Sequence, residues 1–383
     1  MYKVMRIVTR LCVGGPTIHV SLLNGLLDKK EYESILVSGM IEDYESDMSY
    51  VADSYNVKPV YIETMSRELN LVKDLKAFSK LIKLIKKEKP DIVHTHLSKA
   101  AMLGRVAAWL CKVPVIIHTY HGNVFQGYFS KPKTMMYILI DKFLAALSTK
   151  IIAISNKQKS ELVGFGIANA SKFEIIPLGF DFDKIVTSDA KRTELVKKYC
   201  LPENAKFASI IGRVTPIKNH DMFLDIAKKL ITKHDDLYFL VVGDGDLFEE
   251  VKTKISARKL GDKIIMTGMI QDMSTIYSLT DIVLLTSKNE GTPVALIEAM
   301  SQSKLVFSTN VGGVSDFIKQ GINGFYFEQS DVDGFVSEIS NWVTNPHNYD
   351  NIREGARTTA VNTFSSTRLV SDIENLYSRC LKK

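Results

Sequence analysis

The sequence predicts an α/β protein made of two doubly wound domains, each with a parallel β-sheet. Short apolar runs typical of strands alternate with longer amphipathic stretches typical of helices along nearly the whole chain. Most of these runs are continuously apolar, as expected for parallel strands that are buried on both faces. The length of 383 residues is sufficient for two domains of ordinary size.

We expect ten strands in two groups of five. The first group lies at residues 4–9, 34–37, 92–96, 115–119 and 151–154, and the second at 207–211, 238–242, 264–267, 282–285 and 305–308. Residues 71–89 carry apolar side chains at helical spacing, and Pro90 ends that helix. Proline and glycine near 175–181 mark the junction, so we expect domains at 1–186 and 187–365, followed by a final helix at about 366–381.

Composition excludes several classes of protein. The chain is 45% hydrophobic and 24% charged, which is typical of a soluble globular protein. No run reaches the roughly 18 apolar residues of a membrane span, and no signal peptide is expected. The four cysteines show no metal or redox spacing, so a reducing cytoplasm is the expected compartment.

Positive charge is concentrated in the first half of the chain. Residues 1–186 contain 25 Lys and Arg against 18 Asp and Glu, a balance of +7, whereas the remainder has 24 against 25 and a balance of −1. A basic half suggests an acidic partner. No nucleic-acid-binding signature is present, so we expect no nucleic acid partner. An anionic membrane surface or a phospholipid-linked acceptor stays open, and with it a peripheral position on the inner face of the cytoplasmic membrane.

Glu290 and Glu298 bracket the segment with the clearest chemical pattern. Thr292 fits an N-cap and Pro293 fits the first turn of a helix, so a helix is expected to begin there with Glu298 about two turns inside it. The free amides at such a helix start, those of Val294 and Ala295, suit a phosphate. Carboxylates on both sides of a phosphate suit the hydroxyls of a nucleotide-sugar. The alternative is two acids on an ordinary surface helix.

This pattern resembles the Glu-x7-Glu motif of retaining GT-B glycosyltransferases of family 4, and the resemblance covers nearly the whole chain. It implies two Rossmann-like domains that face a central cleft, with the C-terminal helix, here 366–383, crossing back to the first domain. It also implies that Glu290 holds the hydroxyls of the donor sugar and that Glu298 holds the ribose, with Gly291 and Thr292 in the same donor site.

Arg213 and Lys218 follow the expected strand at 207–211, where ligands of open α/β sheets bind. A cation pair there suits a diphosphate, and the family pattern implies that these cations stabilise the leaving group. An exposed basic turn is the alternative. By the same resemblance, the turn at Gly243 lies near the nucleotide, and the backbone of Met269 and Ile270 contacts the base.

In the first domain, Gly14 and Gly15 resemble the glycine-rich loop of the family, which approaches the phosphate and the acceptor. His121 and Gly122 match its His-Gly element, which implies that His121 lines the reaction centre beside the donor sugar. A structural histidine is the alternative. Four histidines near two strand ends, His94, His96, His118 and His121, are candidates for zinc ligation, but no cysteine or carboxylate stands in ligand spacing with them. No metal or other cofactor is therefore expected.

The resemblance implies a retaining hexosyltransferase that moves a sugar from a nucleotide-diphosphate-sugar, with UDP-sugar as the expected form, to a hydroxyl acceptor. The stretches 91–100 and 118–129 look like bacterial surface-polysaccharide glycosyltransferases, which implies a lipid-linked glycan acceptor in capsule or lipopolysaccharide assembly. The aromatic and basic loop 123–133 is a candidate acceptor site. The alternatives are a GT-B sugar-nucleotide epimerase and a non-enzymatic sugar-nucleotide-binding protein.

Overall fold

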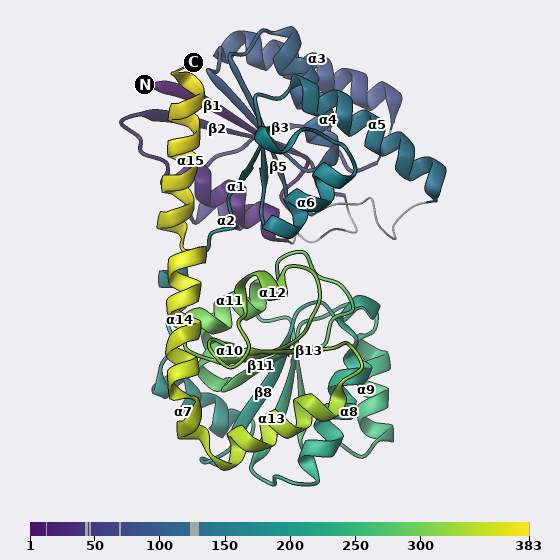
Figure 1. The fold of residues 1–383 in the computed structure, drawn as a ribbon, viewed down its shortest axis with the longest axis vertical. Helices are drawn as coiled ribbons and strands as arrows, with labels where there is room; N and C mark the ends of the chain where they lie inside the picture. The colour runs from purple at the N-terminus through teal and green to yellow at the C-terminus, as the bar shows by residue number, and fades with distance from the viewer. Residues whose placement is uncertain (13, 43–44, 46, 69, 123–129, 383) are drawn as a thin grey trace. The chain divides into compact units, whose positions relative to one another are not determined.

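The computed structural model describes residues 1–12, 14–42, 45, 47–68, 70–122 and 130–382. The chain divides into two compact units (Figure 1). Unit 1 comprises Met1–Phe180 together with the C-terminal segment from Ser366, and unit 2 comprises Asp181–Ser365. The first division, after Phe180, falls slightly earlier than the predicted one after residue 186.

Unit 1 contains a parallel sheet of seven strands within the described residues, in the order β3-β2-β1-β4-β5-β6-β7. Successive strands run outward from the centre in both directions, so the order reverses between β1 and β4. The strands are β1 (Tyr2–Val8), β2 (Tyr32–Gly39), β3 (Val60–Ile62), β4 (Ile92–His96), β5 (Val115–Tyr120), β6 (Lys150–Ala153) and β7 (Phe173–Ile175).

Helices cover both faces of this sheet, which explains its continuously apolar strands. On β4, Ile92 packs in the core beneath α1 and α15, whereas the next residue, Val93, packs in the core beneath α3 and α4. The helical elements of unit 1 are α1 (Gly15–Leu26), α2 (Ser49–Asp53), α3 (Leu71–Glu88), α4 (Ser98–Leu110), α5 (Lys131–Leu147), α6 (Asn156–Gly164), η1 (Ala170–Lys172) and α15 (Ser366–Leu381).

The last helix, α15, is part of unit 1 although the chain reaches it from unit 2. Its start is fixed by the Ser366 N–H, which donates to the Phe180 carbonyl at 2.9 Å. Further along, the buried Tyr377 hydroxyl contacts two groups of the sheet, His94 Nδ1 at 2.7 Å and Arg6 NH2 at 3.1 Å. Buried polar groups of this kind are costly unless they are paired, so these contacts specify where the helix docks.

Unit 2 contains a parallel sheet of six strands within the described residues, in the order β10-β9-β8-β11-β12-β13. Its order reverses between β8 and β11. The strands are β8 (Lys206–Ile211), β9 (Leu237–Val242), β10 (Ile264–Gly268), β11 (Ile282–Leu285), β12 (Leu305–Thr309) and β13 (Phe325–Phe327). The helical elements are η2 (Phe182–Lys184), α7 (Asp189–Lys198), η3 (Pro216–Lys218), α8 (His220–Ile231), α9 (Phe248–Ala257), α10 (Met273–Leu279), α11 (Val294–Ser301), α12 (Val314–Phe317), α13 (Val332–Thr344), η4 (Pro346–Tyr349) and α14 (Asp350–Phe364).

All ten predicted strands are present, with small shifts at their ends. Three further strands, β3, β7 and β13, were not predicted. Each has three residues and lies at an edge of its sheet. Among the described residues, no helix is both long enough and apolar enough to cross a membrane.

Candidate active site

The carboxyl ends of β8 and β11 bring Lys218 and Glu290 together in unit 2. Lys218 ends η3, which follows β8, and Glu290 lies in the loop after β11. Lys218 Nζ donates to Glu290 Oε1 at 2.6 Å, and both side chains are largely buried. Strands β8 and β11 flank the point where the strand order reverses, which is where open α/β sheets bind ligands. Two residues 72 positions apart therefore meet at this point.

Contacts from three strand ends fix the position of Glu290. Ser287 Oγ donates to Glu290 Oε1 at 2.6 Å, and Thr309 Oγ1, at the end of β12, donates to the Ser287 carbonyl at 2.6 Å. Gly312 lies against the backbone of Glu290, because a Cβ at Gly312 would come within 1.8 Å of the Glu290 carbonyl oxygen. Its φ of +56° also favours glycine. The sequence analysis missed Ser287 and Gly312, although Gly312-Gly313 after a strand was a signal.

The two cations predicted for a diphosphate differ in their surroundings. Arg213 is exposed directly after β8, whereas Lys218 is engaged by Glu290. The Gly243 turn after β9 packs against the same loop, because a Cβ at Gly243 would lie 2.1 Å from the Gly212 carbonyl oxygen. With a φ of +129°, Gly243 occupies a conformation that other residues rarely adopt. The predicted residues of β8 and β9 therefore share one edge of the sheet.

Met269 and Ile270 follow Gly268 at the end of β10, beside the Gly243 turn. The Gly243 N–H donates to the Gly268 carbonyl at 2.9 Å. Met269 is 61% exposed, which is unusual for a large apolar side chain. Their role in contacting a base stays a prediction.

Helix α11 begins later than predicted. Pro293 is the N-cap residue and no side chain caps the helix, so the assignment of Thr292 as N-cap was wrong. Val294 and Ala295 are the first two helical residues, and the first backbone bond of the helix runs from the Leu296 N–H to the Pro293 carbonyl at 3.1 Å. The amides of Val294 and Ala295 therefore precede the first backbone bond of the helix, and their role in binding a phosphate stays a prediction. Gly291 lies just before them and is exposed.

Glu298 lies about one turn inside α11, not two, because the helix begins at Val294. The Tyr277 hydroxyl on α10 donates to Glu298 Oε2 at 2.9 Å. Burial raises the pKa of Glu298 to about 7, although the Tyr277 hydrogen bond opposes this shift. Burial therefore favours the neutral form of the Glu298 carboxyl and holds its pKa above the ordinary range. The sequence analysis missed Tyr277, which carries no motif signal.

In unit 1, the predicted residues lie at the carboxyl ends of β1 and β5. Gly14 is the N-cap residue of α1 and Gly15 is its first residue. His121 and Gly122 follow β5. Burial lowers the pKa of His121 to about 4, so its ring is neutral at pH 7. A Cβ at Gly122 would meet none of the described atoms within 4 Å.

The four histidines that were weighed as zinc ligands do not assemble. His96 Nδ1 lies 3.0 Å from His121 Nε2, but His94 bonds to Tyr377 and, at 2.7 Å, to Thr119. His118 bonds to Thr95 on the opposite face of the sheet, because side chains alternate along a strand. His19 on α1, which was not considered from the sequence, lies beside His96 and His121 instead.

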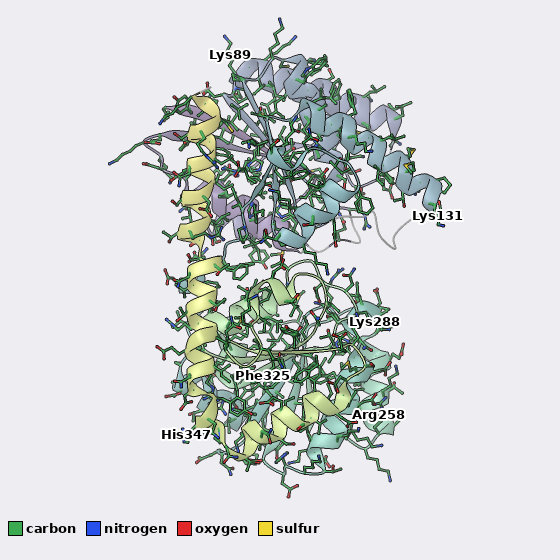
Figure 2. The ribbon with its side chains drawn as sticks, viewed as in Figure 1. Lys89, Lys131, Arg258, Lys288, Phe325 and His347 are labelled. Carbon is green, nitrogen blue, oxygen red and sulfur yellow. The ribbon has the colours of Figure 1, made fainter. Side chains whose placement is uncertain are left out.

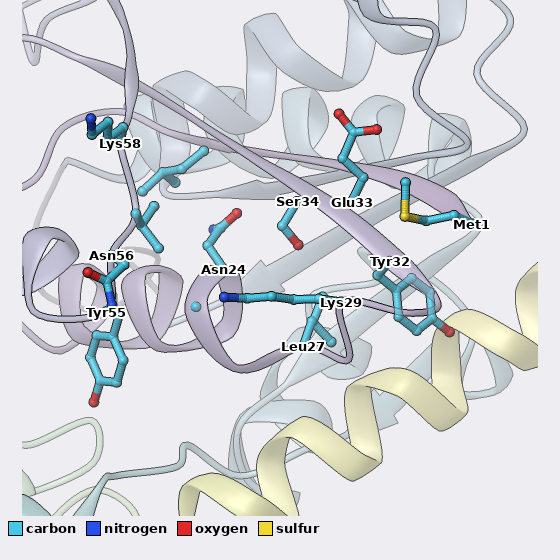
Figure 3. A pocket seen from close by; sticks show the side chains of 13 residues that line it. Met1, Asn24, Leu27, Lys29, Tyr32, Glu33, Ser34, Tyr55, Asn56 and Lys58 are labelled. Carbon is cyan, nitrogen blue, oxygen red and sulfur yellow. The ribbon is translucent and has the colours of Figure 1, made fainter.

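Residues 123–129 of the predicted acceptor loop, 123–133, lie outside the described residues; Lys131, at the start of α5, belongs to the remainder of it (Figure 2). A pocket of about 310 Å³ in unit 1 is lined by residues such as Asn24, Tyr32 and Asn56 (Figure 3). Because Tyr32 begins β2, this pocket lies at the amino edge of the sheet, opposite the predicted site.

Comparisons with known proteins identify the class. A family model described as "Glycosyl transferases group 1" matches residues 191–359, and one described as "Glycosyltransferase Family 4" matches residues 13–184. UDP-Gal:alpha-D-GlcNAc-diphosphoundecaprenol alpha-1,3-galactosyltransferase of Escherichia coli is 31% identical over 92% of this chain and 90% of its own length. The capsular polysaccharide biosynthesis glycosyltransferase CapM of Staphylococcus aureus is 25% identical over 86% of this chain and 87% of its own.

The structural comparisons agree on the fold. Anabaena HepE in complex with UDP aligns with a TM-score of 0.84 at 17% identity, covering 98% of this chain and 100% of that one. A Rickettsia africae glycosyltransferase aligns with a TM-score of 0.85 at 24% identity, covering 100% and 99%. The class is thus a GT-B glycosyltransferase, an enzyme of the hexosyltransferase type. Within that class, the chain belongs to family 4 and to its bacterial surface-polysaccharide type.

Proposed function

We propose that this enzyme transfers a sugar from a UDP-sugar to a hydroxyl of a lipid-linked glycan, with retention of configuration and without a metal. The observation that carries the proposal is the Lys218–Glu290 pair at the strand-order reversal of unit 2, followed along the chain by the start of α11 and by the partly buried Glu298 within that helix. This arrangement offers a cation, free amides and two carboxylates to one elongated ligand.

Each group has a role that follows from its chemistry. Arg213 and Lys218 bind the diphosphate, together with the amides of Val294 and Ala295, and stabilise the negative charge that grows on it as the sugar leaves. The donor displaces Lys218 from Glu290, which frees the carboxylate to accept hydrogen bonds from sugar hydroxyls. Glu298 accepts from the ribose hydroxyls in its ionised form. The neutral His121 contacts the donor sugar.

Retention follows from attack on the face that the diphosphate leaves. The bond from the anomeric carbon to the phosphate oxygen breaks as the acceptor oxygen bonds to the same carbon, and the acceptor proton passes to the departing phosphate. No covalent intermediate with the enzyme forms. The cations supply the charge stabilisation that a divalent metal supplies elsewhere, so no metal is needed.

The acceptor is proposed from the E. coli relative and from unit 1. The name of that relative gives a diphosphoundecaprenol-linked GlcNAc as its acceptor. Three neighbouring helices of unit 1, α3, α4 and α5, expose large apolar side chains, including Leu75 (60%), Trp109 (53%) and Phe143 (58%). Such a patch, with the +7 balance of residues 1–186, suits an anionic membrane that carries the acceptor.

One assay tests the proposal. The EDTA-treated enzyme is incubated with a panel of UDP-sugars and a GlcNAc-diphospho-lipid, and UDP release and the anomeric configuration of the product are measured. We expect acceptor-dependent UDP release and a product with the configuration of the donor. An inverted product, or activity that returns only with Mn²⁺ or Mg²⁺, would overturn the mechanism.

A further inference from the structure

Three histidines from different elements of unit 1 converge at the carboxyl edge of its sheet. His19 lies in the second turn of α1, His96 ends β4 and His121 follows β5. One ring nitrogen of each can be chosen so that the three atoms lie within 4.8 Å of one another. The ring centroids of His19 and His121 are 4.9 Å apart, and those of His19 and His96 are 5.5 Å apart.

The rings of this histidine cluster are buried with most of their hydrogen-bonding capacity unused. Both nitrogens of His19, Nε2 of His96 and Nδ1 of His121 have no partner among the described residues. His19 is only 3% exposed. Within the described part of the chain, one hydrogen-bond contact joins two of these rings, between His96 Nδ1 and His121 Nε2 at 3.0 Å. Leaving buried polar atoms unpaired costs roughly 1–3 kcal/mol each. A ligand that binds these nitrogens would remove that cost.

The neighbouring histidines show what structural pairing looks like in the same sheet. His94 has partners on both nitrogens, Tyr377 and Thr119. His118 is held by Thr95. The cluster differs because four of its six ring nitrogens lack a partner among the described residues. Imidazole nitrogens from three residues that lie within 4.8 Å of one another are a donor set that divalent transition metals prefer.

We propose that His19, His96 and His121 bind one Zn²⁺ ion and that the bound ion arrests sugar transfer. Zinc–nitrogen bonds of about 2.0–2.1 Å place tetrahedral ligands about 3.3 Å apart, so small side-chain rotations complete the site. The fourth position is left to water. The inhibition of sugar transfer rests on the proposed function, because a His121 side chain that is bound to Zn²⁺ no longer contacts the donor sugar. The binding does not depend on that function.

Titration of the full-length, EDTA-treated enzyme with Zn²⁺ tests the site directly. Calorimetry should give about one equivalent, and Co²⁺ in place of Zn²⁺ should give the visible absorption of a tetrahedral site. His19→Ala should weaken Zn²⁺ binding by a factor on the order of 10–100 or more. Loss of a residue that only hydrogen-bonds to a metal ligand already costs that much affinity, and His19 is proposed as a ligand itself. His347→Gln, which alters a 95% exposed histidine of unit 2, is the matched control and should bind Zn²⁺ like the wild type.

Transfer assays test the arrest. Zn²⁺ should inhibit the wild type and EDTA should restore it, while UDP affinity stays unchanged because the side chains proposed to bind the diphosphate and the ribose, those of Arg213, Lys218 and Glu298, lie in unit 2. The transfer activity of His19→Ala should be the same with and without Zn²⁺. Thermal unfolding checks that this variant is folded, and His19→Gln replaces it if it is not.

The outcomes separate the two proposals. Wild-type enzyme that binds Zn²⁺ no better than His19→Ala overturns the site. Saturation of the site without inhibition overturns the arrest. An enzyme that binds Zn²⁺ at the cluster but transfers no sugar in its EDTA-treated form contradicts the proposed function and leaves the metal site standing.

Discussion

Lys218 and Glu290 are the residues whose behaviour differs most from what the sequence suggested. Their motifs assign them to different parts of the donor, the diphosphate and the sugar, yet they form an ion pair with each other at 2.6 Å. In the largely buried site, each charge needs a partner when no donor is bound. The pairing therefore gives each charge a partner, and under the proposed function the donor replaces one partner for each residue.

Lys218→Ala should lower the turnover of UDP-sugar by a factor of about 10²–10³, because it removes a preorganised charge from the leaving group. Steady-state kinetics and UDP calorimetry measure the effect on rate and affinity. Lys229→Ala is the control, since Lys229 also forms an ion pair in unit 2, with Asp333, but is half exposed. Equal effects of the two substitutions would remove Lys218 from the site.

Glu298 should make UDP binding depend on pH. Its pKa of about 7 means that its carboxyl is largely protonated below pH 7, whereas hydrogen bonds from the ribose hydroxyls favour the ionised form. Binding then releases a proton, so affinity should rise by up to about tenfold per pH unit below pH 7 and level off above it. Because UDP itself titrates, the comparison is with Glu298→Gln, measured by calorimetry from pH 5.5 to 8.5. Parallel pH profiles of UDP affinity for the wild type and Glu298→Gln would exclude Glu298 as the group that causes the pH dependence.

At the scale of elements, strands were easier to predict than the starts of helices. The ten long strands are apolar runs that the burial of both sheet faces requires. The edge strands β3, β7 and β13 are too short to carry a pattern, and β3 exposes Val60 and Tyr61. The N-cap was misplaced because Thr292 has the right chemistry, but the contact of the preceding loop with Gly312 brings the chain into α11 at Pro293.

The loop after β12 should control the loop that carries Glu290. Gly312→Ala would place a methyl group 1.8 Å from the Glu290 carbonyl oxygen at a φ of +56°, so the Glu290 loop must move. We expect a large loss of transfer activity and a stability loss above the roughly 1–2 kcal/mol of left-handed backbone alone. Gly321→Ala is the control, since its φ is +69° but a Cβ there meets no described atom within 4 Å. Denaturant unfolding measures the stability of both variants, and steady-state kinetics measures their transfer activity. Similar losses in Gly312→Ala and Gly321→Ala would contradict this role of Gly312.

At the scale of the whole molecule, the sequence predicted the class of fold and the existence of two units. It did not predict which residues meet at each sheet edge. His19 shows why: it belongs to no motif, and it lies near His96 and His121 because α1 begins at the sheet edge where β4 and β5 end. Tyr277, which is 21 positions from Glu298 along the chain, was missed for the same reason. Motifs indicate chemistry along the chain, whereas these contacts arise from topology.

Membrane association should depend on unit 1. Replacing both Leu139 and Phe143, which are 59% and 58% exposed on α5, with glutamate should reduce co-sedimentation with anionic liposomes. Added salt should weaken binding of the wild type. Ile322→Glu, at a 66% exposed position of unit 2, should leave it unchanged. Equal recovery of the wild type with neutral and anionic liposomes at low salt would contradict an electrostatic contribution to membrane binding.

The central claim is that Glu290 and Glu298 hold different parts of one nucleotide-sugar, and calorimetry with UDP beside transfer kinetics tests it most directly. Glu298→Ala should weaken UDP binding about tenfold or more, because it leaves the ribose hydroxyls unpaired. Glu290→Ala should leave UDP affinity nearly unchanged and mainly reduce sugar transfer. Loss of UDP binding in Glu290→Ala, with normal binding in Glu298→Ala, would contradict the assignment.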